Sequence, residues 1–107
     1  MPRGVKTHKL DELDIMDLRV VLALYKTGGT HQAAQSLGVT QSMIVYRSQL
    51  VENYFQQAIY YRRSKGSYFT PFGMMLVQYA EHILDLYTEM MLFAKSYKEV
   101  PNVDLPK

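Results

Sequence analysis

A helix predicted over residues 41–55 carries an uncharged polar face near its start. With 3.6 residues per turn, amide, hydroxyl and compact apolar side chains gather on one side of its first turns. They are Gln41, Ser42, Val45, Tyr46 and Gln49. A solvated helix face usually carries Lys and Glu, whereas these groups can pair with base edges in the major groove of DNA, and a valine can contact a thymine methyl. The face is therefore a candidate for reading bases; the alternative is a solvated face that happens to lack charge.

The residues before this helix complete a helix-turn-helix unit. Residues 30–37 are amphipathic, and Gly38 can adopt the left-handed conformation that ends a helix. Thr40 is a good N-cap for the helix that follows. Two helices joined by a short turn that contains glycine form a helix-turn-helix. Ala33 and Ala34 are small enough to let the two backbones approach, so we expect them at the crossing.

Two further segments are expected to support this unit. Residues 11–27 predict a scaffold helix with an inward stripe of Leu18, Val21, Leu22 and Tyr25. The third helix should turn inward the stripe Ile44, Ser48, Val51 and Phe55.

A short hairpin is predicted within residues 56–70. Ile59-Tyr60-Tyr61 and Ser67-Tyr68-Phe69 favour strands, and Ser64-Lys65-Gly66 favours the turn between them. Three basic side chains lie at or near the tip: Arg62, Arg63 and Lys65. A basic hairpin directly after such a helix indicates a wing, whose contacts with a phosphate backbone position a protein without reading sequence.

A long helix is predicted from residue 71 to about Lys98. Thr70 is a good N-cap, and Pro71 fits the first helical position, where its missing N–H costs nothing. Apolar residues recur along it at alternating spacings of four and three: Phe72, Leu76, Tyr79, Ile83, Leu86, Met90, Phe93 and Tyr97. A helix of roughly 28 residues is about 42 Å long, which is more than the small preceding domain can cover. We therefore expect this seam to pair with a second chain; packing on its own domain suits only the first two turns.

Composition bounds the class of protein. A chain of 107 residues with 48% hydrophobic residues indicates one domain with a small core. There are no cysteines, and hence no disulfide framework or thiolate metal site. No apolar run approaches 18 residues and no signal-type segment follows the N-terminus. We expect no membrane partner and a bacterial protein located in the cytoplasm with the nucleoid.

Catalytic groupings are absent from the sequence. It has no nucleophile paired with a base, no paired carboxylates in an apolar setting and no glycine-rich phosphate loop. His31 has no Cys or His at ligand spacing, so it is interpreted as a surface or phosphate-facing residue. We expect no enzymatic activity, no metal and no cofactor.

Positive charge is unevenly distributed along the chain. Residues 1–10 hold three basic and no acidic side chains, and residues 39–70 hold four basic and one acidic. Residues 11–38 and 71–107 are each net negative. This pattern suits a polyphosphate ligand, and chance segregation is the alternative. We interpret residues 1–10 as a flexible basic arm and residues 100–107 as a loose tail.

The order of these elements resembles the DNA-binding region of LysR-type transcriptional regulators. The resemblance runs without a gap from about Leu18 to Leu84. It is carried by Gly28, Ala33-Ala34-x-x-Leu37-x-Val39-Thr40-Gln41-Ser42, Ile44, Glu52, Arg62, Thr70-x-x-Gly73 and Tyr79-Ala80.

The resemblance implies a mainly α fold with a winged helix-turn-helix at residues 11–70 and a long dimerisation helix at residues 71–99. It implies a dimer on double-stranded DNA whose long helices pair antiparallel. Base contacts would come from the polar face defined above. Backbone contacts are expected from Thr30, Thr40, Arg47, Arg62, Arg63 and Lys65.

Several residues depart from the family pattern. The family usually has Ser-Phe at Gly29-Thr30, Ser and a polar residue at Val45-Tyr46, and an apolar residue at Ser48. It also carries a large effector-binding domain that these 107 residues lack, so we expect no small-molecule effector. We predict a homodimeric regulator on a roughly palindromic site. The alternatives are a module that heterodimerises with a full-length LysR-type regulator and a non-specific architectural protein.

Overall fold

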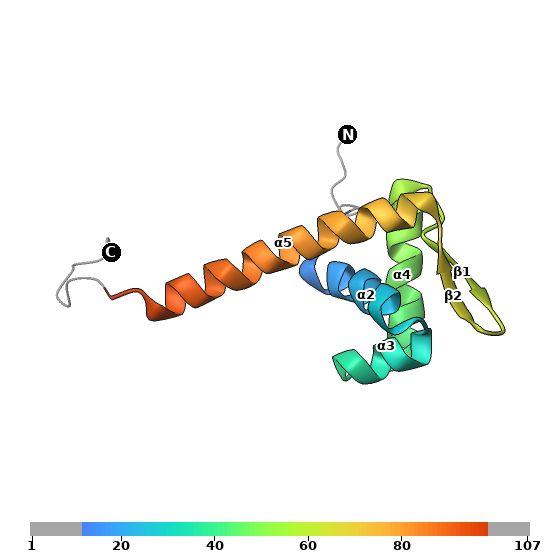
Figure 1. Cartoon of the computed structure of the whole chain (residues 1–107), viewed down its shortest axis with the longest axis horizontal. Helices are drawn as coiled ribbons and strands as arrows, with labels where there is room; N and C mark the ends of the chain where they lie inside the picture. Colours follow the sequence, from blue (N-terminus) through green and yellow to red (C-terminus); the bar gives the residue numbers. More distant parts are fainter. Residues whose placement is uncertain (1–11, 99–107) are drawn as a thin grey trace, which may run out of the picture.

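A computed structural model describes residues 12–98, so the expected basic arm at residues 1–10 and the tail at residues 100–107 lie outside the described residues. The described part contains four helices and a two-stranded hairpin, which confirms the predicted mainly α, winged helix-turn-helix fold (Figure 1). The elements are α2 (Ile15–Thr27), α3 (Thr30–Leu37), α4 (Gln41–Phe55), β1 (Tyr60–Arg63), β2 (Gly66–Phe69) and α5 (Pro71–Ser96). Figure 1 shows α5 extending far beyond the other elements, with the hairpin near its N-terminal end.

Local capping sets where each helix begins. Helix α2 begins at Ile15 and not at the predicted residue 11, because Asp14 is its N-cap. The carboxylates of Asp14 and Asp17 each accept a 3.0 Å bond from the other's backbone N–H, a capping box. Thr40 caps α4 and Thr70 caps α5, as predicted. Helix α5 ends at Ser96, slightly earlier than predicted.

The core lies where α2 meets α3, α4, α5 and the hairpin. One buried cluster joins α2, α3 and α4: Val20, Ala23, Leu24, Ala33, Ala34 and Ile44. A second cluster joins α2, α4 and α5: Val21, Val51, Ile59 and Val77. The alanines of α3 are buried as predicted, and so are Ile44, Ser48 and Val51 of the α4 stripe, while Phe55 at its end is half-buried.

The predicted stripe of α2 is confirmed in part. Val21 is fully buried, but Leu18 and Leu22 are half-buried and Tyr25 is 44% exposed. Helix α2 contacts α3, α4 and α5 at once, so its apolar residues are buried on several sides. Tyr25 instead packs edge-on against Phe69 of the hairpin, with ring centroids 5.4 Å apart.

The hairpin is antiparallel, and its register pairs Tyr60 with Phe69 and Arg63 with Gly66. Ile59, predicted as a strand residue, lies before β1 as a buried core residue, and its N–H donates to Glu52 Oε2 at 2.8 Å. The N–H of Ser67 donates to the carbonyl of Gly28 at 2.9 Å, which ties the wing to the turn between α2 and α3.

The first half of α5 packs against the domain. Its buried residues are Gly73, Val77, Ala80 and Leu84, which follow one side of the helix. At Gly73 the backbone of α5 lies so close to the carbonyl oxygen of Ile59 that no Cβ fits there. This approach fixes the direction in which α5 leaves the domain.

Candidate nucleic-acid interface

The structure brings the five predicted base-reading residues together on one surface. Gln41, Ser42, Val45, Tyr46 and Gln49 line a single shallow groove on α4. Val45 is half-buried and the other four are exposed, with Tyr46 57% exposed. We call this surface the polar face of α4. Its exposed side chains can meet a ligand.

The start of the polar face is tied to α3. The side-chain amide of Gln41 donates a 2.6 Å hydrogen bond to the hydroxyl of Thr30. Thr30 is buried, with 5% exposed surface, and it is therefore poorly placed for the backbone contact expected of it. Its hydroxyl instead orients Gln41.

Ser48 shows how the opposite side of α4 is held. Its hydroxyl lies 3.0 Å from the carbonyl oxygen of Val45 and 3.2 Å from the hydroxyl of Tyr60 in β1. The polar residue that interrupts the apolar stripe is thus buried with partners, which satisfies the rule that buried polar groups are hydrogen-bonded. It joins α4 to the wing.

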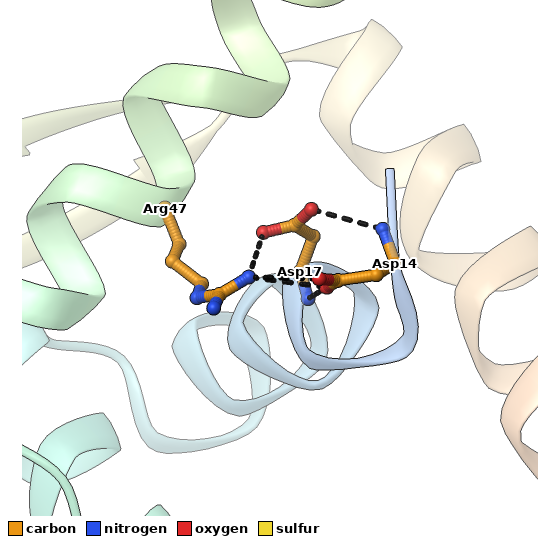
Figure 2. Close-up of polar contacts among 3 residues, drawn as sticks. All are labelled: Asp14, Asp17 and Arg47. Carbon is orange, nitrogen blue, oxygen red and sulfur yellow. Dashed lines mark hydrogen bonds and ion pairs between the residues drawn. The ribbon is translucent and has the colours of Figure 1, made fainter. Parts of the chain in front are cut away.

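Arg47, expected to contact the DNA backbone, is paired within the domain with two carboxylates. Figure 2 shows its side chain reaching from α4 to the two carboxylates at the start of α2. Its Nη1 lies 3.0 Å from Asp17 Oδ1 and 3.1 Å from Asp14 Oδ1. The hydrogen bond with Asp17 raises the pKa of Arg47 above its usual range, against the effect of burial. Burial raises the pKa of Asp14, but the N–H of Asp17 and the Arg47 guanidinium outweigh it, so this pKa is lowered.

The wing and the turn before α3 enclose a polar cleft. It is lined by residues 27–32 on one side and residues 62–67 on the other. Arg62, Arg63 and Lys65 are exposed, and His31 lies in the same cleft. We call it the wing cleft. It places three expected backbone-contact residues beside the N-terminal end of α3, where the helix dipole also favours an anion.

The seam of α5 divides into two parts. Phe72 packs on Phe55 with ring centroids 5.6 Å apart, and Leu76 packs against the second core cluster. The remaining seam residues are exposed, and three of them by more than 60%: Tyr79, Leu86 and Phe93. Ile15 and Tyr87, which the sequence pattern did not single out, line an apolar groove with Ile83, Leu86, Met90 and Phe93.

Two other kinds of site are absent from the described part of the chain. Residues 12–98 hold no group of three His, Asp or Glu side chains placed to bind a metal ion. Within the same residues, every helix is too short or too polar to cross a bilayer.

A helix-turn-helix flanked by a basic hairpin and followed by a long helix defines the winged helix-turn-helix class of DNA-binding folds. Residues 15–74 match the family described as "Bacterial regulatory helix-turn-helix protein, lysR family". This match covers more than half of the chain, and the protein therefore belongs to the LysR family, as the resemblance in sequence implied.

Named relatives align with about two thirds of this chain. The HTH-type transcriptional regulator GltR of Bacillus subtilis is 38% identical over 72 residues, which are 67% of this chain and 24% of GltR. YofA of Bacillus velezensis, also an HTH-type transcriptional regulator, is 36% identical over 73 residues, 68% of this chain and 25% of YofA. The chain thus spans about a quarter of the length of these curated relatives.

Solved structures share the fold. The DNA-binding domain of CbnR in a complex with DNA has a TM-score of 0.73 at 23% identity, and the match covers 78% of this chain and 97% of that chain. At this identity the likeness establishes the arrangement of the helices and the wing, and no more.

Proposed function

We propose that this protein is a transcriptional regulator that binds a roughly palindromic DNA site sequence-specifically as a homodimer. The observation that carries the proposal is the polar face of α4, where five side chains suited to base edges share one exposed groove. An α-helix fits the major groove of B-DNA, and residues near its N-terminus reach the bases. In this arrangement Gln41 and Gln49 supply the amide groups that pair with adenine, and Val45 supplies the apolar contact for a thymine methyl.

Phosphate contacts would fix the register of α4 in the groove. Arg62, Arg63 and Lys65 line the wing cleft beside the N-terminal end of α3. Thr40 is exposed, and its hydroxyl oxygen accepts a bond from the N–H of Met43. The hydroxyl proton is not used in that bond, so it can be donated to a phosphate. Such contacts hold the protein on DNA without reading sequence.

Dimerisation is inferred from the exposed part of the α5 seam. Tyr79, Ile83, Leu86, Met90, Phe93 and Tyr97 present apolar surface that residues 12–98 do not cover. Exposed apolar patches of this extent mark interaction sites. One copy of the polar face offers few side chains, so a second copy held at a fixed spacing would supply the remaining discrimination.

Sedimentation combined with competition binding tests this proposal. We expect the purified chain to sediment at twice its 12.4 kDa mass and to prefer one duplex over a scrambled duplex of equal composition. A ratio near one between the affinities for the two duplexes would indicate a sequence-indifferent architectural protein. A chain that remains monomeric until it is mixed with a full-length LysR-type regulator would indicate a heterodimerising module.

A further inference from the structure

The pairing of Arg47 with α2 carries an inference about how α4 is positioned. A single guanidinium nitrogen, Nη1, makes all the contacts: 3.0 Å to Asp17 Oδ1, and 3.1 and 3.2 Å to the two carboxylate oxygens of Asp14. Asp17 is 2% exposed, although Asp14 lies open to solvent. Nε of Arg47 is buried and has no hydrogen-bond partner within the described residues.

Burial of Asp17 opposes any turn of the Arg47 guanidinium away from α2. If the guanidinium turned outward to a phosphate, the Asp17 carboxylate would remain in the core with its opposite charge removed. An uncompensated buried charge is strongly unfavourable, more so than the loss of an exposed pair. Arg47 therefore stays with α2 while α4 meets its ligand.

The neighbouring residue makes a second directional contact. Ser48 lies within hydrogen-bond distance of Tyr60 of the wing, whereas Arg47 reaches the start of α2, so two consecutive residues join α4 to two different elements. Two further polar contacts lie at the ends of α4, where Gln41 donates to Thr30 and Glu52 accepts from the N–H of Ile59. Between them the interface of α4 is otherwise apolar, through Ile44 and Val51. Apolar burial has no preferred direction, whereas hydrogen bonds and ion pairs fix angles. These polar contacts are placed to set how far α4 can rotate and slide.

We infer that Arg47 is a positioning residue that fixes the orientation of the polar face of α4, and through it sequence discrimination, without contacting DNA itself. This inference rests on the function proposed above. Base recognition demands placement within roughly 0.5 Å and 10–20°. Arg47 lies on α4 next to Tyr46 and two residues before Gln49, so a rotation that its loss permits moves those side chains directly.

The variants Arg47→Met and Arg47→Lys separate positioning from phosphate contact. Arg47→Met should lower the ratio of affinities for the best and the scrambled duplex roughly tenfold or more, because base contacts become misplaced. The dependence of log K on log salt should not change. Arg47→Lys should restore part of the ratio that Arg47→Met loses, since one ammonium group can replace Nη1.

The matched control is Arg19→Met, which removes an arginine that stacks on Tyr87 away from α4. A uniform loss on both duplexes with a salt slope shallower by about 0.9 would make Arg47 a phosphate ligand and overturn the inference.

The double variant Arg47→Met, Asp17→Asn separates positioning from simple stability. Removing the buried charge should raise Tm above that of Arg47→Met alone, while the Asn side chain keeps an oxygen for the N–H of Asp14. The affinity ratio should remain low, because the contact between α4 and α2 is still missing. A ratio that returns fully together with Tm would show that Arg47 only stabilises the fold.

Hydrogen exchange distinguishes failure of this inference from failure of the proposed function. If the unsubstituted protein shows no preference among duplexes, the proposed function fails. The positioning role of Arg47 is then tested by amide hydrogen exchange alone. Arg47→Met should then accelerate exchange of the α4 amides more than that of the buried half of α5. Equal protection of α4 in both proteins would overturn the inference.

Discussion

The amide of Gln41 donates a 2.6 Å hydrogen bond to the hydroxyl of Thr30, and this bond joins the first residue of α4 to the first residue of α3. It uses one of the two amide N–H groups of Gln41 and leaves the other N–H and Oε1. These remaining groups are the pair with which a glutamine recognises adenine. Gln41 is therefore oriented before it meets DNA, which lowers the entropy lost on binding.

Replacing Gln41 or Gln49 with Ala tests base reading. Each change should weaken binding to the best site by roughly 1–3 kcal/mol and binding to random DNA very little. Thr30→Val, which removes only the oxygen that orients Gln41, should produce a smaller loss of the same kind. Gln35→Ala on the exposed side of α3 is the control. Equal losses on the best site and on random DNA would remove the base-reading role.

Neutral substitutions in the wing cleft test phosphate contact. Arg62→Gln, Arg63→Gln and Lys65→Gln should each weaken binding to all duplexes alike and reduce the salt slope by about 0.9, because one fewer counterion is released. Lys26→Gln is the control: it removes a lysine from an exposed pair with Glu81 at 3.8 Å, and such pairs contribute little. Slopes that match the unsubstituted protein would rule out the contact.

A charge on the α5 seam tests the dimer. Ile83→Glu or Leu86→Glu should convert the dimer to a monomer in sedimentation, because a carboxylate would be buried in an apolar interface. The domain should still fold, since both side chains are exposed in a single chain. Thr88→Glu, an exposed change on the other side of α5, should leave the dimer intact. A Leu86→Glu protein that remains dimeric would place the interface elsewhere.

Gly73→Ala tests the approach of α5 to the hairpin. The added methyl would meet the carbonyl oxygen of Ile59 and lie 2.9 Å from Phe69 Cδ2. Overpacking of this kind costs about 1–3 kcal/mol, measurable as a lower midpoint in urea denaturation. Met74→Ala, at an exposed neighbouring position, should change stability much less. Equal stability of Gly73→Ala and the unsubstituted protein would contradict the close packing.

The lowered pKa of Asp14 predicts a loss of stability in acid. A carboxyl group whose pKa is lower in the folded state contributes its full stabilisation above its ordinary pKa, which is 3.8 for Asp14. This stabilisation is lost as the pH falls from that value through the lower pKa of the folded state. Asp14→Asn should reduce the slope of unfolding free energy against pH in this range, while the Asn still caps α2. The effect should stay below about 1 kcal/mol because the side chain is 63% exposed. Identical slopes would show that Asp14 contributes nothing.

Features that depend on neighbouring residues were predictable from the sequence. Thr40 and Thr70 cap their helices as predicted, because an N-cap is decided within one turn. The bounds of α4 and the burial of Ala33 and Ala34 also agree with prediction. Phe72 and Leu76 pack on their own domain, as expected for the first two turns of the long helix, and pairing of the remaining seam residues stays a prediction.

Features that depend on distant residues were missed. Arg47 looks like a free cation on α4, yet Asp17 lies 30 residues away in sequence, and only the packing of α2 on α4 brings them together. The spacing of Asp14 and Asp17 near the start of one helix was the available signal. Ser48 similarly needed the position of Tyr60, which depends on where the wing folds back. The exposure of Tyr25 in the predicted α2 stripe has the same origin, because a helix covered on several sides has no single apolar face.

Selection of bound sequences from a random DNA pool, with the purified protein, tests the central claim most directly. Two copies of the polar face, held by paired α5 helices, should enrich a motif with two related halves in inverted orientation at one fixed spacing. The Gln49→Ala variant should blur matching positions in both halves. A pool that shows no enriched motif, or a single half without a partner at a fixed distance, would contradict sequence-specific binding as a homodimer.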